Sequence, residues 1–238
     1  MTESSPKTSG IMLAERGALI RSIPRIFDEL SEQDRSRLYA IGKSLFFAPD
    51  TPIFSQGDEH QGIHLIETGR VHSYYKAPSG RAVTLAYWLP GNFVGAPAMF
   101  GGGSHMWESV AVQKTTTIFL QGDALRALAA GSASIALALL DALAFKARCY
   151  STMAQMLGTR SAAERLKHLL RFLATTYGLK EPDGTVVAAV FTQAELANLI
   201  GSTRQWVTVQ LARLQERGII RYDRGGLLVI RDLDALDR

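Results

Sequence analysis

The chain has 238 residues, of which 47% are hydrophobic and 20% are charged, and its formal net charge is +4. This is the composition of a globular protein of one large or two ordinary domains. The single cysteine, Cys149, excludes an intramolecular disulfide and a cluster of cysteine metal ligands. No apolar run is long enough to span a bilayer, and the polar N-terminus lacks the apolar core of a signal peptide, so we expect a cytoplasmic protein without a membrane partner.

The first half of the chain predicts a short helical region followed by a β-domain. Residues 1–17 are rich in Ser and Thr and are expected to form a flexible tail, and helices are expected at 18–30 and 31–42, the second beginning at Ser31. Short apolar segments then alternate with Gly- and Pro-containing turns, which favours a β-barrel or jelly roll over a βαβ sheet. The expected strands are 45–47, 52–54, 63–66, 71–75, 82–88, 110–112 and 116–120.

The chain becomes helical again after Gly122-Asp123, and residues 132–157 contain no Pro or Gly. Two apolar faces run along this long helix, so it is expected to bury against more than one surface, the barrel and a second copy of the helix. One face has the spacing of a coiled-coil seam, with Lys146 in the missing slot: Leu139, Leu143, Tyr150, Met153 and Leu157. The other face is wider: Ile135, Leu139, Ala142, Cys149, Met153 and Met156.

Residues 191–220 predict two short helices joined by a tight turn. Thr192 and Glu195 have the spacing of a capping box at the start of the first helix. Gly201 ends that helix, and either Ser202 or Thr203 begins the next, with Gln205 at capping-box distance from Ser202.

The second of these helices has a buried stripe and a polar face. The stripe consists of Val207, Leu211 and Leu214. Strand, turn and strand are expected at 219–222, 223–226 and 227–230, which would form a wing. The segment 201–224 carries a local net charge of +3, with Glu216 and Asp223 opposed by five arginines: Arg204, Arg213, Arg217, Arg221 and Arg224. We predict a winged helix-turn-helix that binds double-stranded DNA; a helical unit for packing or protein docking is the alternative.

This order of elements resembles the Crp–Fnr family of bacterial transcription regulators, over roughly residues 30–235. Four segments carry the resemblance: Phe54–Asp58 (FSQGD), Ile63–Val71 (IHLIETGRV), Pro90–Gly95 (PGNFVG) and Gly201–Val207 (GSTRQWV). The resemblance implies an α+β chain with an N-terminal jelly-roll barrel, a long dimerisation helix and a C-terminal winged helix-turn-helix. The corresponding parts are an effector-sensing barrel domain with its flanking helices at 18–131, a dimerisation and coupling helix at 132–158 and a DNA-binding domain at 159–238. The resemblance also implies a homodimer on near-palindromic DNA, which contacts RNA polymerase if it is an activator.

The same resemblance assigns roles on the second helix. Arg204 matches the family arginine that contacts a guanine edge, and Gln205 stands where many members have Glu, which suits adenine instead. Trp206 is bulkier than the usual Thr, and Val209 stands where many members have a second basic residue, so we expect a different half-site. Gln205 is also explained by helix capping alone. The expected DNA-binding residues are Thr192, Ser202, Thr203, Arg204, Gln205, Thr208, Val209 and Arg213.

The barrel lacks the residues that bind a cyclic nucleotide in the Crp–Fnr family. Cyclic-nucleotide binding in this family rests on a Glu after the PGxxxG segment and on a following Arg, whereas here Ala96-Pro97 follows Gly95 and no arginine occurs from 82 to 121. Cyclic AMP is therefore disfavoured, although a cyclic-nucleotide-responsive regulator remains an alternative.

Other cofactors are disfavoured as well. An iron–sulfur cluster would need more cysteines, and the histidines match no axial haem pattern, so we predict no cofactor and leave the effector unknown. An apolar effector pocket with one acidic group is one hypothesis and ordinary core packing is the other, for these residues: Phe93, Ala96, Met106, Trp107, Glu108, Cys149 and Tyr150.

A metal-dependent β-barrel enzyme is the second functional class that we consider. His60, His64, Glu67 and His72 cluster in the sequence, but His60 precedes the expected strand, and His64 and Glu67 fall on opposite faces of it. We therefore interpret these histidines as surface residues and do not expect an enzyme.

Overall fold

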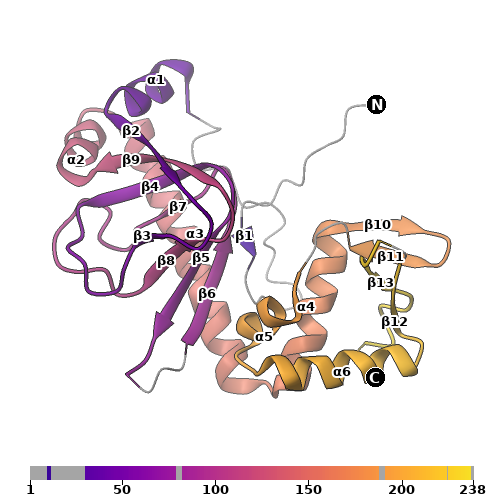
Figure 1. The fold of residues 1–238 in the computed structure, drawn as a ribbon. Helices are drawn as coiled ribbons and strands as arrows, with labels where there is room; N and C mark the ends of the chain where they lie inside the picture. Colours follow the sequence, from indigo (N-terminus) through magenta and orange to yellow (C-terminus); the bar gives the residue numbers. More distant parts are fainter. Residues whose placement is uncertain (1–9, 12–29, 79–81, 188–190, 224, 237–238) are drawn as a thin grey trace. The chain divides into compact units, whose positions relative to one another are not determined.

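The computed structural model describes residues 10–11, 30–78, 82–187, 191–223 and 225–236 (Figure 1). The predicted tail, and the predicted helix at 18–30 apart from Leu30, lie outside the described residues, except for the two-residue strand β1 (Gly10–Ile11). The chain divides into two compact units, chiefly residues 22–150 and residues 151–238. This division falls inside the long helix, eight residues before the end of the predicted coupling segment.

The first unit is built on two antiparallel sheets, as the sequence predicts. One sheet has the order β1-β6-β5-β8-β3 and the other the order β2-β9-β4-β7. The remaining strands are β2 (Gly42–Phe47), β3 (Pro52–Phe54), β4 (Gly62–Thr68), β5 (Val71–Lys76), β6 (Ala82–Trp88), β7 (Phe93–Val94), β8 (Glu108–Ala111) and β9 (Thr115–Gln121). All seven predicted strands are present. The sequence did not indicate β1 and β7, because two residues carry no periodicity.

Close backbone packing explains one glycine of the PGNFVG segment. Gly95 follows β7 with a φ of +107°, and a Cβ atom there would lie 2.7 Å from the carbonyl oxygen of Gly62 at the start of β4. A side chain at this position would be both strained and overlapping. Gly95 therefore lets residues 92–95 lie directly against β4.

Three helices belong wholly or partly to this unit: α1 (Glu32–Ala40), α2 (Gly122–Ala130) and the first part of α3 (Ala133–Thr159). Ser31 caps α1 by accepting a hydrogen bond from Asp34 N at 3.1 Å, as expected. Buried residues from all three helices join those of the β4–β9 sheet in one core, which includes Leu38, Ile63, Leu120, Leu125, Ile135 and Leu139. The helices therefore close the barrel and are part of its hydrophobic core.

The burial of residues along α3 differs from what the predicted coiled-coil seam implies. Leu139 and Lys146 of the predicted coiled-coil seam are each only 2% exposed, so this part of the seam is not open to a second copy. Leu137 and Leu140 are instead 60% exposed. Periodicity identified two apolar faces, but it could not say which of them the barrel covers.

The second unit contains the predicted winged helix-turn-helix. Its helices are α4 (Ala162–Tyr177), α5 (Gln193–Ile200) and α6 (Arg204–Glu216). Its sheet has the order β10-β11-β13-β12, formed by β10 (Gly178–Glu181), β11 (Gly184–Val187), β12 (Ile220–Tyr222) and β13 (Leu228–Ile230). The pair β12–β13 is the expected wing, whereas the β10–β11 hairpin was not predicted.

Candidate nucleic-acid interface and effector region

The helix-turn-helix begins with the capping box that the sequence predicts. Thr192 Oγ1 accepts a hydrogen bond from Glu195 N at 3.1 Å, and Glu195 Oε2 accepts one from Thr192 N at 2.8 Å. Gly201 ends α5 in the left-handed conformation, with a φ of +64°. The turn therefore has the geometry that Gly best allows.

The N-cap of α6 is Thr203, whose Oγ1 accepts a hydrogen bond from Trp206 N at 3.2 Å. The alternative start at Ser202 is therefore wrong, and with it the capping-box explanation of Gln205. Thr203 is the N-cap because its backbone is extended (φ −94°, ψ 149°), as an N-cap requires. Arg204 and Gln205 are the first two residues of the helix, and both side chains are exposed.

The two faces of α6 are clearly separated. Val207, Leu211 and Leu214 are buried, as predicted, while Gln205, Thr208 and Val209 are exposed. On a helix of 3.6 residues per turn, Gln205 and Val209 lie opposite the buried stripe, and Thr208 lies about a quarter turn from it. The Thr208 hydroxyl lies 2.9 Å from the Arg204 carbonyl oxygen and also hydrogen-bonds Gln193 Oε1 of α5. The hydroxyl proton of Thr208 is therefore engaged within the protein. The side chain can offer a DNA base its oxygen lone pair or its methyl group.

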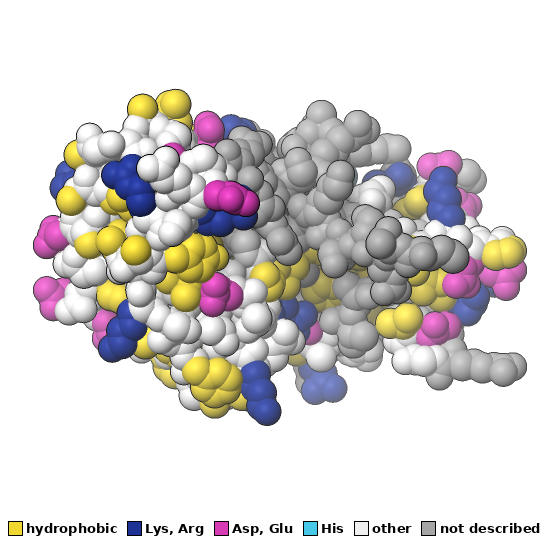
Figure 2. Space-filling model, turned by 90° about the horizontal axis from the view of Figure 1, so that it is seen from above, with side chains coloured by type: hydrophobic (Ala, Val, Ile, Leu, Met, Phe, Trp, Pro, Cys, Tyr) yellow, Lys and Arg dark blue, Asp and Glu magenta, His cyan; other side chains and the backbone are white. Residues whose placement is uncertain are grey.

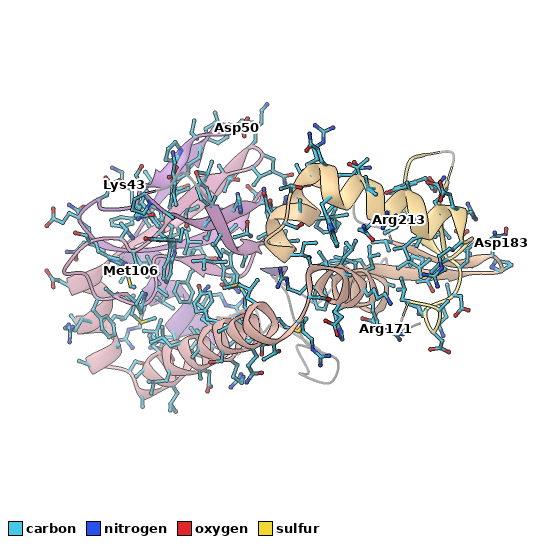
Figure 3. The ribbon with its side chains drawn as sticks, turned by 90° about the horizontal axis from the view of Figure 1, so that it is seen from below. Lys43, Asp50, Met106, Arg171, Asp183 and Arg213 are labelled. Carbon is cyan, nitrogen blue, oxygen red and sulfur yellow. The ribbon has the colours of Figure 1, made fainter. Side chains whose placement is uncertain are left out.

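A basic groove of about 370 Å³ lies between α4 and one side of α6. Ala163, Leu166 and Leu214 form its apolar part, and Lys167, Arg213 and Arg217 supply its cations, with Glu216 the one acidic group. Figure 3 labels Arg213 on α6. The sequence did not associate Lys167 with this surface, because α4 and α6 are far apart along the chain.

The wing has a defined turn. Asp223 accepts hydrogen bonds on Oδ1 from Gly225 N at 2.8 Å and from Leu227 N at 2.7 Å. Arg221 pairs with Asp183 at 3.9 Å, and the predicted basic residue Arg224 lies outside the described residues. Of the five predicted arginines, three are described and exposed: Arg204, Arg213 and Arg217.

Arg165 of α4 connects three backbone segments of the second unit, a role that the sequence did not reveal. Its Nε donates to the Ile200 carbonyl at the end of α5, at 2.8 Å. Its Nη1 lies 3.4 Å from the Leu157 carbonyl in the last turn of α3 and 2.8 Å from the carbonyl of Arg160, which directly follows α3. One guanidinium thus satisfies carbonyl groups at two helix ends, which have no partner within their own helices.

Replacing Arg165 with Ala is expected to destabilise the second unit by about 2 kcal/mol, because charge-assisted hydrogen bonds are lost and carbonyl groups lose their partners. Urea unfolding followed by a probe in this unit measures the effect. Arg165→Lys keeps the charge but not the fork of donors, so it should recover only part of the loss. Unchanged stability in Arg165→Ala would contradict the role of this residue.

The residues of the hypothesised effector pocket lie in different environments. Phe93, Ala96 and Cys149 are buried, Trp107, Glu108 and Tyr150 are half-buried, and Met106 is 63% exposed (labelled in Figure 3). The rings of Trp107 and Tyr150 meet edge to face at 5.8 Å, and Trp88 lies 6.5 Å from Tyr150. Burial raises the pKa of Cys149 to about 12, so its thiolate, the reactive form, is disfavoured.

Glu108 lies beside a tyrosine. It is paired with Tyr74 across β8 and β5. Desolvation raises the pKa of Tyr74 to about 12, and the Glu108 carboxylate adds to this shift by hydrogen bond and by charge. Glu108 is thus partnered within the sheet.

The histidines that suggested a metal site are partnered separately. His60 and His64 are 3% and 8% exposed, so their interpretation as surface residues is wrong. His60 Nε2 hydrogen-bonds the Gly95 carbonyl, His64 Nδ1 lies 3.2 Å from Thr117 Oγ1, and His72 Nε2 lies 2.9 Å from Thr84 Oγ1. Burial keeps His64 and His72 neutral by lowering their pKa values to about 3 and about 4. Within the described residues, no three His, Cys, Asp or Glu side chains converge as metal ligands.

Two family models match this chain. The cyclic nucleotide-binding domain matches residues 44–132, and the Crp-like helix-turn-helix domain matches residues 164–238. The chain belongs to the Crp–Fnr family of transcription regulators. It is therefore a DNA-binding regulator and not an enzyme.

Known Crp–Fnr proteins are similar over most of the length of this regulator. It is 29% identical to the CRP-like cAMP-activated global transcriptional regulator of Mycobacterium tuberculosis, over 78% of this chain and 83% of that protein. It is also 29% identical to the cyclic AMP receptor protein of Thermus thermophilus, over 79% of this chain and 81% of that protein. A solved structure of a CooA mutant from Carboxydothermus hydrogenoformans has the same fold, with a TM-score of 0.76 at 20% identity, over 97% of this chain and 98% of that one.

On the face of the first unit that Figure 2 shows, basic and acidic side chains are interspersed, without a large patch of one sign. No helix in the described parts of the chain has the length and hydropathy of a bilayer-spanning segment.

Proposed function

We propose that this regulator binds near-palindromic DNA as a homodimer and responds to a signal other than cyclic AMP. The observation that carries the DNA-binding part is the start of α6, where Thr203 caps the helix and leaves Arg204 and Gln205 exposed beside Thr208 and Val209. An exposed polar helix start, held by a partner helix and followed by a wing, fits the major groove.

The chemistry of the exposed residues favours a particular kind of half-site. Arg204 has the planar fork of donors that pairs with guanine O6 and N7, and Gln205 has the amide that pairs with adenine N6 and N7. Val209, which is 47% exposed, adds an apolar surface suited to a thymine methyl group. We therefore expect a half-site that contains adjacent G·C and A·T pairs.

The exposed face of α3 supports the homodimer. Leu137, Leu140, Ala144 and Ala147 are all exposed and lie three, four and three residues apart. Such spacing forms one continuous seam along a helix that packs on a parallel copy. Two leucines followed by two alanines give this seam an apolar character that water does not favour.

The barrel supports a signal different from cyclic AMP. Anionic phosphate needs a cation, and Lys114 is the only cationic residue from 82 to 121. Glu108, in the segment where a phosphate-binding arginine would be expected, is acidic and lies beside Tyr74. RNA polymerase is a further partner if the protein activates transcription in the cytoplasm.

Arg204→Ala is the direct test of base reading, on duplexes selected from a random-sequence pool. Loss of one bidentate base contact is expected to cost about 1–3 kcal/mol of binding free energy and to relax preference at one base pair per half-site. Arg126→Ala, which removes an equal charge from α2 in the barrel, serves as the control and should leave binding unchanged. A uniform loss over all sequences would mean that Arg204 contacts phosphate instead of a base.

A further inference from the structure

The most unusual group in the first unit is an amino group in the interior. Lys146 lies on α3 and is 2% exposed, among the largest fully buried side chains of the described chain. Lysine is almost never fully buried, because taking its amino group out of water is costly unless that group is well partnered. The surroundings of Nζ therefore need an explanation.

Three residues of the barrel surround this nitrogen. Lys146 Nζ donates a hydrogen bond to Asn92 Oδ1 at 2.8 Å. It lies 3.4 Å from the centroid of the Trp88 ring and 4.5 Å from that of the Phe93 ring. One amide oxygen and two aromatic faces are the groups that attract an alkylammonium ion. We call Trp88, Asn92 and Phe93 the amine cage.

The cage is built by the barrel itself. Trp88 ends β6 and is 1% exposed, while Asn92 and Phe93 are both fully buried. Asn92 Oδ1 also accepts a hydrogen bond from Phe93 N at 2.8 Å, which orients the side-chain oxygen. The oxygen that receives Nζ is thus fixed by the backbone of the PGNFVG segment.

We propose that the amine cage is a binding site for a primary alkylamine and that Lys146 is its permanently attached ligand. The amino group joins the barrel to α3 from within, so this side of the barrel needs no diffusible molecule to hold the helix. The proposal goes beyond the DNA-binding function, and only its DNA-binding arm rests on that function. Burial lowers the pKa of Lys146 well below 10.5, and the neighbouring Cys149 opposes this shift to a smaller extent.

A variant with the ligand removed tests the proposal. Lys146→Ala deletes the atoms from Cγ to Nζ, which correspond to n-propylamine. Millimolar n-propylamine is expected to raise the thermal midpoint of this variant by several degrees, because a ligand of the folded state stabilises it. Wild type, whose cage is filled, should show no such shift. 1-Propanol, which has the same size without the amino group, should have little effect.

Three further measurements complete the test. Lys146→Met fills a similar volume without a donor, so it should be less stable than wild type and should not respond to the amine. If Lys146→Ala does not fold alone, its refolding yield should rise with n-propylamine and not with 1-propanol. DNA affinity of Lys146→Ala should fall about tenfold or more and recover with the amine.

Equal responses to amine and alcohol, no response to either, or full wild-type stability of Lys146→Met would overturn the amine site. Amine-specific stabilisation without recovery of DNA binding would leave the site in place and overturn its link to the winged helix-turn-helix.

Discussion

Replacing Leu137 and Leu140 together with glutamate is expected to convert the proposed dimer into a monomer. Both side chains are 60% exposed on the outer face of α3, so the free protomer tolerates the change. In a parallel helix pair, however, each copy would place two carboxylates against those of its partner, and like charges would replace two apolar contacts. Light scattering after gel filtration at micromolar concentration measures the mass directly.

The same variant should lose most of its affinity for a full operator. A dimer binds two half-sites with one association, and this linkage raises affinity by about 10²–10⁴ without new contacts. The variant should therefore bind a full site little better than a single half-site. Leu179→Glu is the matched control, since Leu179 is 61% exposed on strand β10 and does not belong to α3, so it should leave both mass and affinity unchanged. A dimeric double variant would place the interface elsewhere.

The barrel is expected to lose stability steeply in mild acid because of His64. Burial lowers the pKa of His64 from 6.5 to about 3, with smaller contributions from the charges of His105 and His60. Between pH 6.5 and about pH 3, His64 therefore stays neutral in the folded state and is protonated in the unfolded chain. Above pH 6.5 His64 does not lower the free energy of unfolding, and below pH 6.5 this free energy falls as the pH decreases toward 3. The loss reaches about 3 kcal/mol near pH 4.5.

His64→Phe should remove this dependence. The imidazole lies among the rings of Phe47, Phe54 and Phe119, with centroid distances from 4.9 to 6.2 Å, so a phenyl group suits the site. Unfolding in urea at several pH values should show a slope below pH 6.5 that is smaller in the variant. Thr117→Val is the control, because it removes the hydrogen-bond partner and keeps the titrating ring, so it should be less stable at all pH values with the slope retained. Parallel profiles for wild type and His64→Phe would contradict the prediction.

The winged helix-turn-helix was predictable because its signals are local. The capping box of Thr192 and Glu195, the left-handed Gly201 and the stripe of Val207, Leu211 and Leu214 each depend on residues within one or two turns. The strands of the barrel were predictable for the same reason. Short apolar segments with turn residues between them determine their own conformation.

The remaining features depend on contacts between segments that are distant in sequence. Arg165 meets Ile200 across 35 residues, and Lys146 meets Asn92 across 54 residues. His64 is buried because strands β4 and β9 pair, which places it beside Thr117. No local pattern shows such partners. The same limit explains why the exposed leucines of α3 were missed, since the barrel decides which apolar face is free.

The position of the N-cap on α6 has a consequence for how this regulator can change its target. Thr203 secures the helix start through Trp206 N, and the side chains of Arg204 and Gln205 contribute nothing to that bond. Substitutions at these two positions therefore alter recognition with little cost to folding. Specificity can drift between related proteins, or be reprogrammed by design, while the scaffold that presents it stays the same.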